Sequence, residues 1–107
     1  MAHICQNLEE VRHHIDALDS QLITLIAQRG NYVAQAAGFK KNAEEVPAPQ
    51  RVEQVISRVT TQATKLGADS IVVEAIWRAM IGAFINSELN THAELAAEHA
   101  ASAPPTH

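Results

Sequence analysis

An apolar stripe that ends in basic residues is the strongest constraint on how this sequence can fold. Apolar residues recur at alternating steps of three and four, which is the spacing of one helix face. The stripe consists of Leu8, Val11, Ile15, Leu18, Leu22 and Leu25, and its next positions are Arg29, Tyr32, Ala36 and then Phe39 or Lys40. A charge on the buried face of a helix costs several kcal/mol unless a partner compensates it. Arg29 and Lys40 therefore predict either internal carboxylate partners or an anionic ligand.

The same stripe predicts a helix that is too long for its own domain. No proline interrupts the sequence from Leu8 to about Lys41, and Gly30 and Gly38 lower helix propensity without breaking the pattern. Some thirty residues at ~1.5 Å each form a rod of about 50 Å, roughly twice the diameter of a compact domain of this length. Its apolar face needs cover from elsewhere, so we expect an intertwined homodimer.

Two shorter helices are expected after this rod. Pro47 and Pro49 lie in a predicted loop from Asn42 to Gln50, and Pro49 suits the first turn of a second helix that ends near Leu66, just before Gly67. Asp69 or Ser70 can cap a third helix. We therefore predict an all-α fold of three helices, one long and two shorter.

The third helix also carries a charge at the end of an apolar stripe. Its apolar positions are Val73, Trp77, Met80, Ile81, Phe84 and Ile85, and Glu88 lies one step beyond Phe84. After Leu89 the composition turns to Ala, Glu, His and Thr, and the chain ends in Ala-Ser-Ala-Pro-Pro-Thr-His. We predict a helical domain over residues 1–98 and a disordered tail over residues 99–107.

Composition excludes several classes of partner. Eight Lys and Arg against 12 Asp and Glu give a net charge of -4, which does not fit a nucleic-acid binder. We find no signal peptide and no apolar stretch approaching the ~20 residues that span a bilayer, so no membrane partner is expected. The single cysteine, Cys5, excludes an internal disulfide and favours a reducing, cytoplasmic location.

We expect no metal site and no cofactor. His13 and His14 are adjacent and point to different sides of a helix, so they cannot chelate one ion together. Cys5 precedes the helix with no base in view, and no glycine-rich phosphate loop or nucleophile elbow occurs.

Helix geometry indicates which basic residues can share a ligand. Arg29 and Lys40 are 11 residues apart, about 20° of rotation and ~16 Å of rise, so two long side chains leaning together could hold one small dianion. Arg12 lies 17 residues before Arg29, about 25 Å away. If Arg12 joins the same site, it does so from a partner subunit.

These residues together carry a resemblance to a known family. The run Leu8-Glu9-Glu10-Val11-Arg12-His13-His14-Ile15-Asp16-Ala17-Leu18-Asp19, then Leu25-Ile26-Ala27-Gln28-Arg29 and Phe39-Lys40, resembles the first helix of the all-α chorismate mutases. The spacing from Arg12 to Arg29 to Lys40 is the family's pattern, and the resemblance covers about residues 8–90. The loop Val46-Pro47-Ala48-Pro49-Gln50-Arg51-Val52 is more similar to the branch that converts isochorismate to salicylate and pyruvate.

The resemblance implies a role for each of five residues. Arg29, with Arg12 from the other subunit, would bind the substrate carboxylates, and Arg51 would help from the loop side. Lys40 would lie beside the ether oxygen and a carboxylate, and Glu88 would hydrogen-bond the same ether oxygen. The implied reaction is pericyclic and needs no nucleophile, metal or cofactor, because the enzyme holds a compact conformer and places donors where charge develops.

Two features point to different branches of the family. The mutases usually carry Glu after the residue equivalent to Arg51, where this chain has Val52, and its loop looks one residue shorter; both changes favour the lyase branch. The lyases, however, have Gln where this chain has Glu88. A carboxyl can donate to the ether oxygen only when protonated, and apolar surroundings favour that form while nearby cations oppose it.

Each residue also has a purely structural interpretation. Arg12 can pair with Glu9 or Asp16 on the helix surface. Arg29 can extend from the apolar stripe into solvent, and Lys40 suits a helix C-terminus. Arg51 can be an exposed residue, and Glu88 can mark where its helix enters solvent. Two further hypotheses therefore stay open: a chorismate mutase proper, and a non-catalytic helical dimerisation module whose charges set register.

Overall fold

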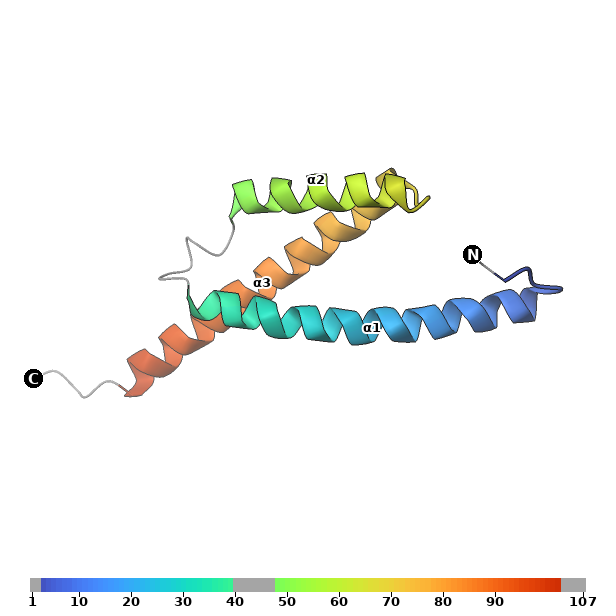
Figure 1. Ribbon diagram of the computed structural model, residues 1–107. Coiled ribbons are helices and arrows are strands. Elements are labelled where there is room, and N and C mark those ends of the chain that lie inside the picture. Colours follow the sequence, from blue (N-terminus) through green and yellow to red (C-terminus); the bar gives the residue numbers. More distant parts are fainter. Residues whose placement is uncertain (1–2, 40–47, 103–107) are drawn as a thin grey trace, which may run out of the picture. The chain divides into compact units, whose positions relative to one another are not determined.

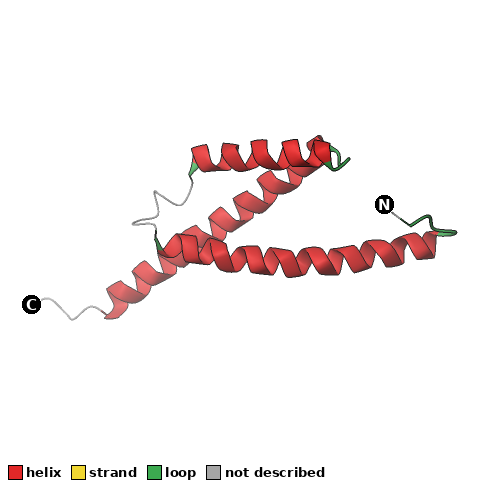
Figure 2. Cartoon of the chain, in the orientation of Figure 1, coloured by secondary structure: helices red, strands yellow, loops and turns green. Residues whose placement is uncertain are grey.

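Three helices and no strand make up the residues that the structure describes (Figure 2). The computed structural model describes residues 3–39 and 48–102, and for residues 91–93, 95–97 and 99–102 it describes the backbone alone. The helices are α1 (Leu8–Gly38), α2 (Pro49–Lys65) and α3 (Ser70–Ser102) (Figure 1). The all-α prediction with three helices is confirmed.

The predicted lengths are wrong for the third helix. It contains 33 residues against 31 in α1, so the described part of the chain has two long helices and one shorter one. The Ala- and Glu-rich sequence after Leu89 contains strong helix formers and no proline before Pro104, which allows α3 to continue to Ser102. The first four residues of the predicted tail are therefore helical, and residues 103–107 lie outside the described part. The boundary at residue 98 stays a prediction.

Hydrogen bonds at its first turn define where α1 begins. The Asn7 side chain accepts from the Glu10 N–H at 2.9 Å, and the Glu10 carboxylate accepts from the Gln6 N–H at 2.8 Å. This arrangement resembles a capping box and satisfies two N–H groups that the helix leaves open. The helix ends at Gly38, slightly before the predicted end near Lys41, which lies outside the described residues.

The chain divides into two compact units, Met1–Gln35 and Ala36–His107. The first unit contains most of α1, and no residue of α1 is buried. Its stripe residues keep between 38% (Val11) and 59% (Leu8) of their surface exposed. A single amphipathic helix of this length cannot cover its own apolar face, so the stripe is available to another chain.

In the second unit, α2 and α3 form a helical hairpin with well-defined ends. Pro49 occupies the first turn of α2. At the other end Gly67 has a φ of 78°, in the left-handed region, and the Ala68 N–H donates to the Ala63 carbonyl at 2.8 Å. This is a Schellman C-cap. Asp69 caps α3 by accepting from the Ile71 N–H at 2.9 Å, as predicted.

The core lies between α2 and α3. Val55, Ile56, Val59 and Ala63 of α2 are each 5–6% exposed. Val59 and Ala63 line a common hollow with Val73 and Trp77 of α3, so the predicted stripe of α3 packs on α2. At the rim, Arg78 holds Glu53 through two hydrogen bonds of 3.0 and 3.1 Å and contacts Glu74 at 2.8 Å.

The stretch Ser70–Asn90 of α3 has a mean hydropathy of 1.2 and is long and apolar enough to cross a membrane by those two criteria. This differs from the expectation that no segment of the chain reaches that limit. Central helices of helical proteins share such a composition, and Arg78 in this stretch pairs with Glu53 of α2. Length and composition therefore do not by themselves place α3 in a membrane.

Candidate active site

Two of the predicted substrate-binding residues lie on α1. Arg12 is exposed in the second turn, and Arg29 is half-buried near the end of the apolar stripe. The helix is continuous between them, so their 17-residue separation corresponds to about 25 Å along its axis. This confirms that Arg12 and Arg29 of one chain cannot grip the same small ligand.

Lys40 is the residue predicted to lie beside the ether oxygen of the substrate. It lies outside the described residues, two positions after Gly38, the last residue of α1. Its role beside the ether oxygen stays a prediction.

Arg51 lies in the first turn of α2, where it is exposed. No side chain caps this helix end, because residue 48 is alanine. Open N–H groups and the positive end of the helix dipole both favour a negative group here, and the Arg51 guanidinium adds to this effect. The next residue, Val52, is half-buried and donates its N–H to the Ala48 carbonyl at 3.0 Å.

Among the side chains that the structure describes, Glu88 is the one buried charged or polar residue, with 8% of its surface exposed. It follows the half-buried Phe84 by one helical step, and α3 continues past it to Ser102. The interpretation that Glu88 marks where α3 enters solvent is therefore wrong. A buried carboxyl must be protonated or compensated by polar partners, and both situations are typical of functional sites.

Arg51 and Glu88 lie on different helices of the hairpin, both beyond the Glu53–Arg78 pair on the side away from the turn at Gly67. The Glu53–Arg78 pair aligns the two antiparallel helices, and Arg51 lies two residues before Glu53. Glu88 follows Arg78 by ten residues, about 15 Å of helix. Glu88 therefore lies about 12 Å farther from this turn than Arg51 along the hairpin. Arg12 and Arg29 belong to the first unit.

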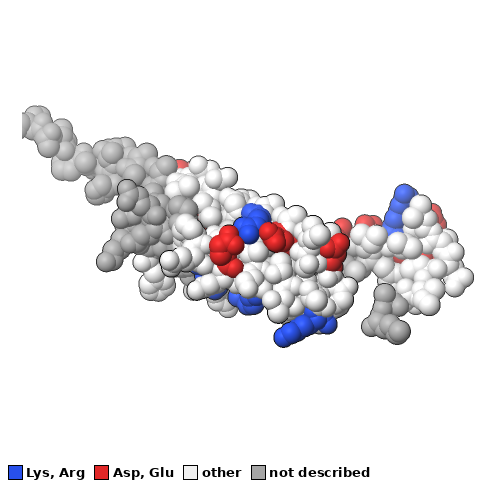
Figure 3. Space-filling model, turned by 90° about the horizontal axis from the view of Figure 1, so that it is seen from above, with Lys and Arg blue, Asp and Glu red and all other residues white. Residues whose placement is uncertain are grey.

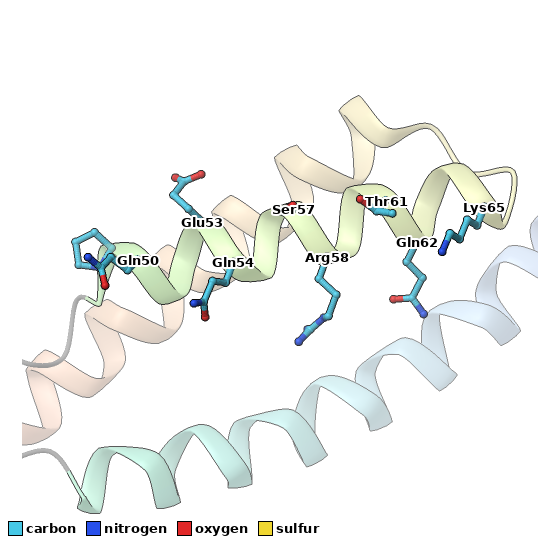
Figure 4. Close-up of a pocket in the computed structure, with 9 residues that line it drawn as sticks. Gln50, Glu53, Gln54, Ser57, Arg58, Thr61, Gln62 and Lys65 are labelled. Atoms are coloured by element: carbon cyan, nitrogen blue, oxygen red, sulfur yellow. The ribbon is translucent and has the colours of Figure 1, made fainter.

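A broad hollow along one face of α2 does not coincide with these residues. Gln54, Arg58 and Gln62 project to the same side of the helix there, as Figure 4 shows. The residues that line the hollow all come from one helix: Pro49, Gln50, Glu53, Gln54, Ser57, Arg58, Thr61, Gln62 and Lys65. The face of a single helix cannot enclose a small ligand, so we do not assign the active site to this hollow.

On the face seen in Figure 3, basic and acidic side chains lie close together in the upper middle of the view, and other basic side chains lie along its lower edge. Within this pattern the Arg78 guanidinium, through its hydrogen bonds and its charge, lowers the pKa of the Glu53 carboxyl. The hydrogen bonds that Arg78 donates to Glu53 and Glu74 raise the pKa of Arg78 in turn. The ion pair was not anticipated from sequence, although the spacing of Glu74 and Arg78, four residues apart on one helix, is a recognisable signal.

Each unit carries basic side chains that could bind an anionic ligand: Arg12 and Arg29 on α1 in the first unit, and Arg51 at the N-terminus of α2 in the second. Comparison with known proteins agrees with this chemistry. The sequence profile of the family described as chorismate mutase type II matches residues 11–89. An isochorismate pyruvate lyase from Pseudomonas aeruginosa is 28% identical over 85 residues, which cover 79% of this chain and 84% of that protein. All five predicted site residues lie within the matched range of the family profile.

Proposed function

This chain belongs to the type II chorismate mutase family and is an enzyme of that family, and we propose that its reaction is the conversion of isochorismate to salicylate and pyruvate. Salicylate biosynthesis is then its metabolic role. The coarser assignment, pericyclic chemistry on a chorismate-type substrate, follows from the family.

The observation that carries the choice of reaction is the residue after Arg51. The mutases usually have a Glu there that contacts the ring hydroxyl, whereas Val52 has no polar side-chain atom, and its backbone N–H is already bonded within α2. A mutase-type contact to the hydroxyl cannot form from this position. The relative named as an isochorismate pyruvate lyase, which aligns over 79% of the chain, supports the same choice.

The reaction balances within the substrate. The ether C–O bond breaks, a ring hydrogen moves to the methylene carbon of the enolpyruvyl group, and the ring becomes aromatic. No external oxidant is consumed. Residues of the protein can accelerate this step by holding the enolpyruvyl arm over the ring and by donating hydrogen bonds to the ether oxygen as negative charge develops on it.

Each predicted residue has a place in this proposal. Arg29 binds one substrate carboxylate from the apolar stripe of α1. Arg51 binds a carboxylate at the N-terminus of α2, where the helix dipole also attracts the negative charge. The family resemblance assigns Lys40 the place beside the ether oxygen. Glu88 hydrogen-bonds that oxygen from α3, and its burial, with 8% of its surface exposed, supports a carboxyl shielded from water.

A homodimer is part of the proposal because one chain cannot complete the site. Arg12 is about 25 Å from Arg29 along α1, and the exposed stripe of α1 offers a continuous apolar surface to a second copy. Two antiparallel copies of α1 would cover each other's stripe and bring the start of one helix near the middle of the other. Arg12 of one subunit would then reach the pocket of its partner. We also propose a cytoplasmic location, in keeping with the lone Cys5.

Product analysis tests the reaction. The purified protein is incubated separately with isochorismate and with chorismate, and the products are separated by chromatography. We expect salicylate and pyruvate in equal amounts from isochorismate. Arg29→Ala, prepared in parallel, should lose this activity and so excludes a contaminating host enzyme. Formation of prephenate from chorismate, with no salicylate from isochorismate, would identify a chorismate mutase proper. Absence of product from both substrates would favour the non-catalytic dimerisation module.

A further inference from the structure

The segment before α1 folds back along the helix and brings three metal-binding side chains together. His3, Cys5 and His14 each offer one ligand atom, and these atoms all lie within 4.8 Å of one another. The rings of His3 and His14 have their centroids 5.3 Å apart and are tilted by 36°. We propose that these three residues form a Zn²⁺ site, none of whose ligands is among the proposed active-site residues.

The fold-back follows from the hydrogen bonds at the start of α1. Asn7 and Glu10 hold the chain at the entry to the helix, with bonds of 2.9 and 2.8 Å to the Glu10 and Gln6 N–H groups. The dark blue segment before α1 in Figure 1 turns back at this point. His14 is seven residues after Asn7, about 10 Å along the axis, and the four residues back from Asn7 to His3 can span about 13 Å. The returning segment is therefore long enough to reach His14.

The donor set selects the class of metal. A thiolate with two imidazoles suits Zn²⁺ and similar borderline divalent ions, whereas Mg²⁺ and Ca²⁺ prefer oxygen ligands. With Zn–N of about 2.0–2.1 Å and Zn–S of about 2.3 Å, tetrahedral ligand atoms lie roughly 3.4–3.7 Å apart. The observed separations of up to 4.8 Å need to contract by only about 1 Å. His3 and His14 are exposed and Cys5 is partly exposed, so side-chain rotation can close that gap.

Three protein ligands leave the fourth tetrahedral position for water or an outside ligand. The bound ion would fasten the segment His3–Gln6 to the second turn of α1. This assignment departs from the expectation of no metal site, which considered only the adjacent pair His13 and His14. The rings of that pair are 6.0 Å apart and roughly perpendicular, and His13 is not in the cluster.

Metal titration of the full chain, with any affinity tag removed, tests the site. Zn²⁺ is titrated in competition with a chromogenic chelator, and Co²⁺ is used as a spectroscopic probe. We expect one ion per chain, a thiolate-to-Co²⁺ charge-transfer band in the near ultraviolet and the intense visible bands of tetrahedral Co²⁺. Cys5→Ser should abolish the charge-transfer band, and His3→Ala and His14→Ala should each weaken Zn²⁺ binding at least about tenfold, because each removes one of three ligands.

His13→Ala is the matched control, since it removes the same kind of ring one position away and should leave binding unchanged. The ligand residues precede α1 or lie exposed on it, so far-ultraviolet circular dichroism should show folded variants. Absence of Zn²⁺ binding, binding that survives in all three cluster variants, or equal loss in His13→Ala would overturn the site. Because the readout is metal binding, its result is independent of whether the protein forms salicylate.

Discussion

Complementation between two inactive variants provides a stringent test of the composite pocket. In Arg12→Ala the chain keeps Arg29, and in Arg29→Ala it keeps Arg12. Because α1 is one continuous helix from Leu8 to Gly38, the two arginines of a chain are held about 25 Å apart. If Arg12 serves the partner's pocket, each homodimeric variant has two damaged sites and should be nearly inactive. A mixed dimer has one site with both arginines and one site with neither.

The expected recovery follows from this symmetry. Random exchange of equal amounts yields about half mixed dimers, each with one intact site out of two, so about a quarter of wild-type activity should return. The two variants are mixed, their subunits are allowed to exchange in mild denaturant, and the dimers are refolded. Salicylate formation is then followed by fluorescence. Each variant refolded alone is the control. If Arg12 and Arg29 served the same subunit's pocket, no mixed dimer would contain an intact site, and an absence of recovery after verified exchange would refute the composite pocket.

Three other predictions follow from the dimer interface, the buried carboxyl and the rim ion pair. Leu22 keeps 53% of its surface exposed in one chain, and burying it in a two-fold interface contributes about 1 kcal/mol per copy. Leu22→Ala should therefore raise the dissociation constant of the dimer, measured by sedimentation velocity, by roughly 10–30-fold. Ile71→Ala, 79% exposed in the first turn of α3, is the control, and equal effects of both changes would argue against the stripe as the interface. Glu88→Ala should lose most of the turnover, whereas Glu88→Gln, which keeps a hydrogen-bond donor, should retain it; equal turnover of the two variants would contradict hydrogen bonding to the ether oxygen from this position. Arg78 lowers the pKa of Glu53 below its ordinary 4.5, so the pair stabilises the fold above that value and the benefit is lost as pH falls through the lowered pKa. Glu53→Gln should therefore melt slightly below wild type at pH 7 and equally at strongly acid pH, and a difference in Tm independent of pH would contradict this linkage.

Local signals in the sequence predicted most of the helix boundaries. Pro49 marks the first turn of α2, Gly67 its left-handed end, and Asp69 the cap of α3. These features depend on backbone chemistry within a few residues, so the sequence alone is sufficient to place them. The helix α3 continues four residues into the predicted tail, because an Ala-rich segment favours helix where no proline intervenes.

The candidate site was only partly predictable because burial depends on tertiary contacts. The position of Glu88 at the end of an apolar stripe was consistent with either a functional carboxyl or a helix entering solvent, and its 8% exposure decides against the second. The cluster of His3, Cys5 and His14 could not be found by helical spacing, since two of its members precede the helix and meet the third only through the fold-back at Asn7. Recognising the Asn7 and Glu10 capping pattern would have indicated where the chain turns.

The ratio of kcat/KM for isochorismate to that for chorismate tests the central claim most directly. Both values are measured on one preparation, with salicylate followed by fluorescence and prephenate by its acid conversion to phenylpyruvate. Our account predicts salicylate formation with a higher kcat/KM than prephenate formation, and loss of both in Arg29→Ala. A higher kcat/KM for chorismate, or salicylate formation at the uncatalysed rate, would contradict it.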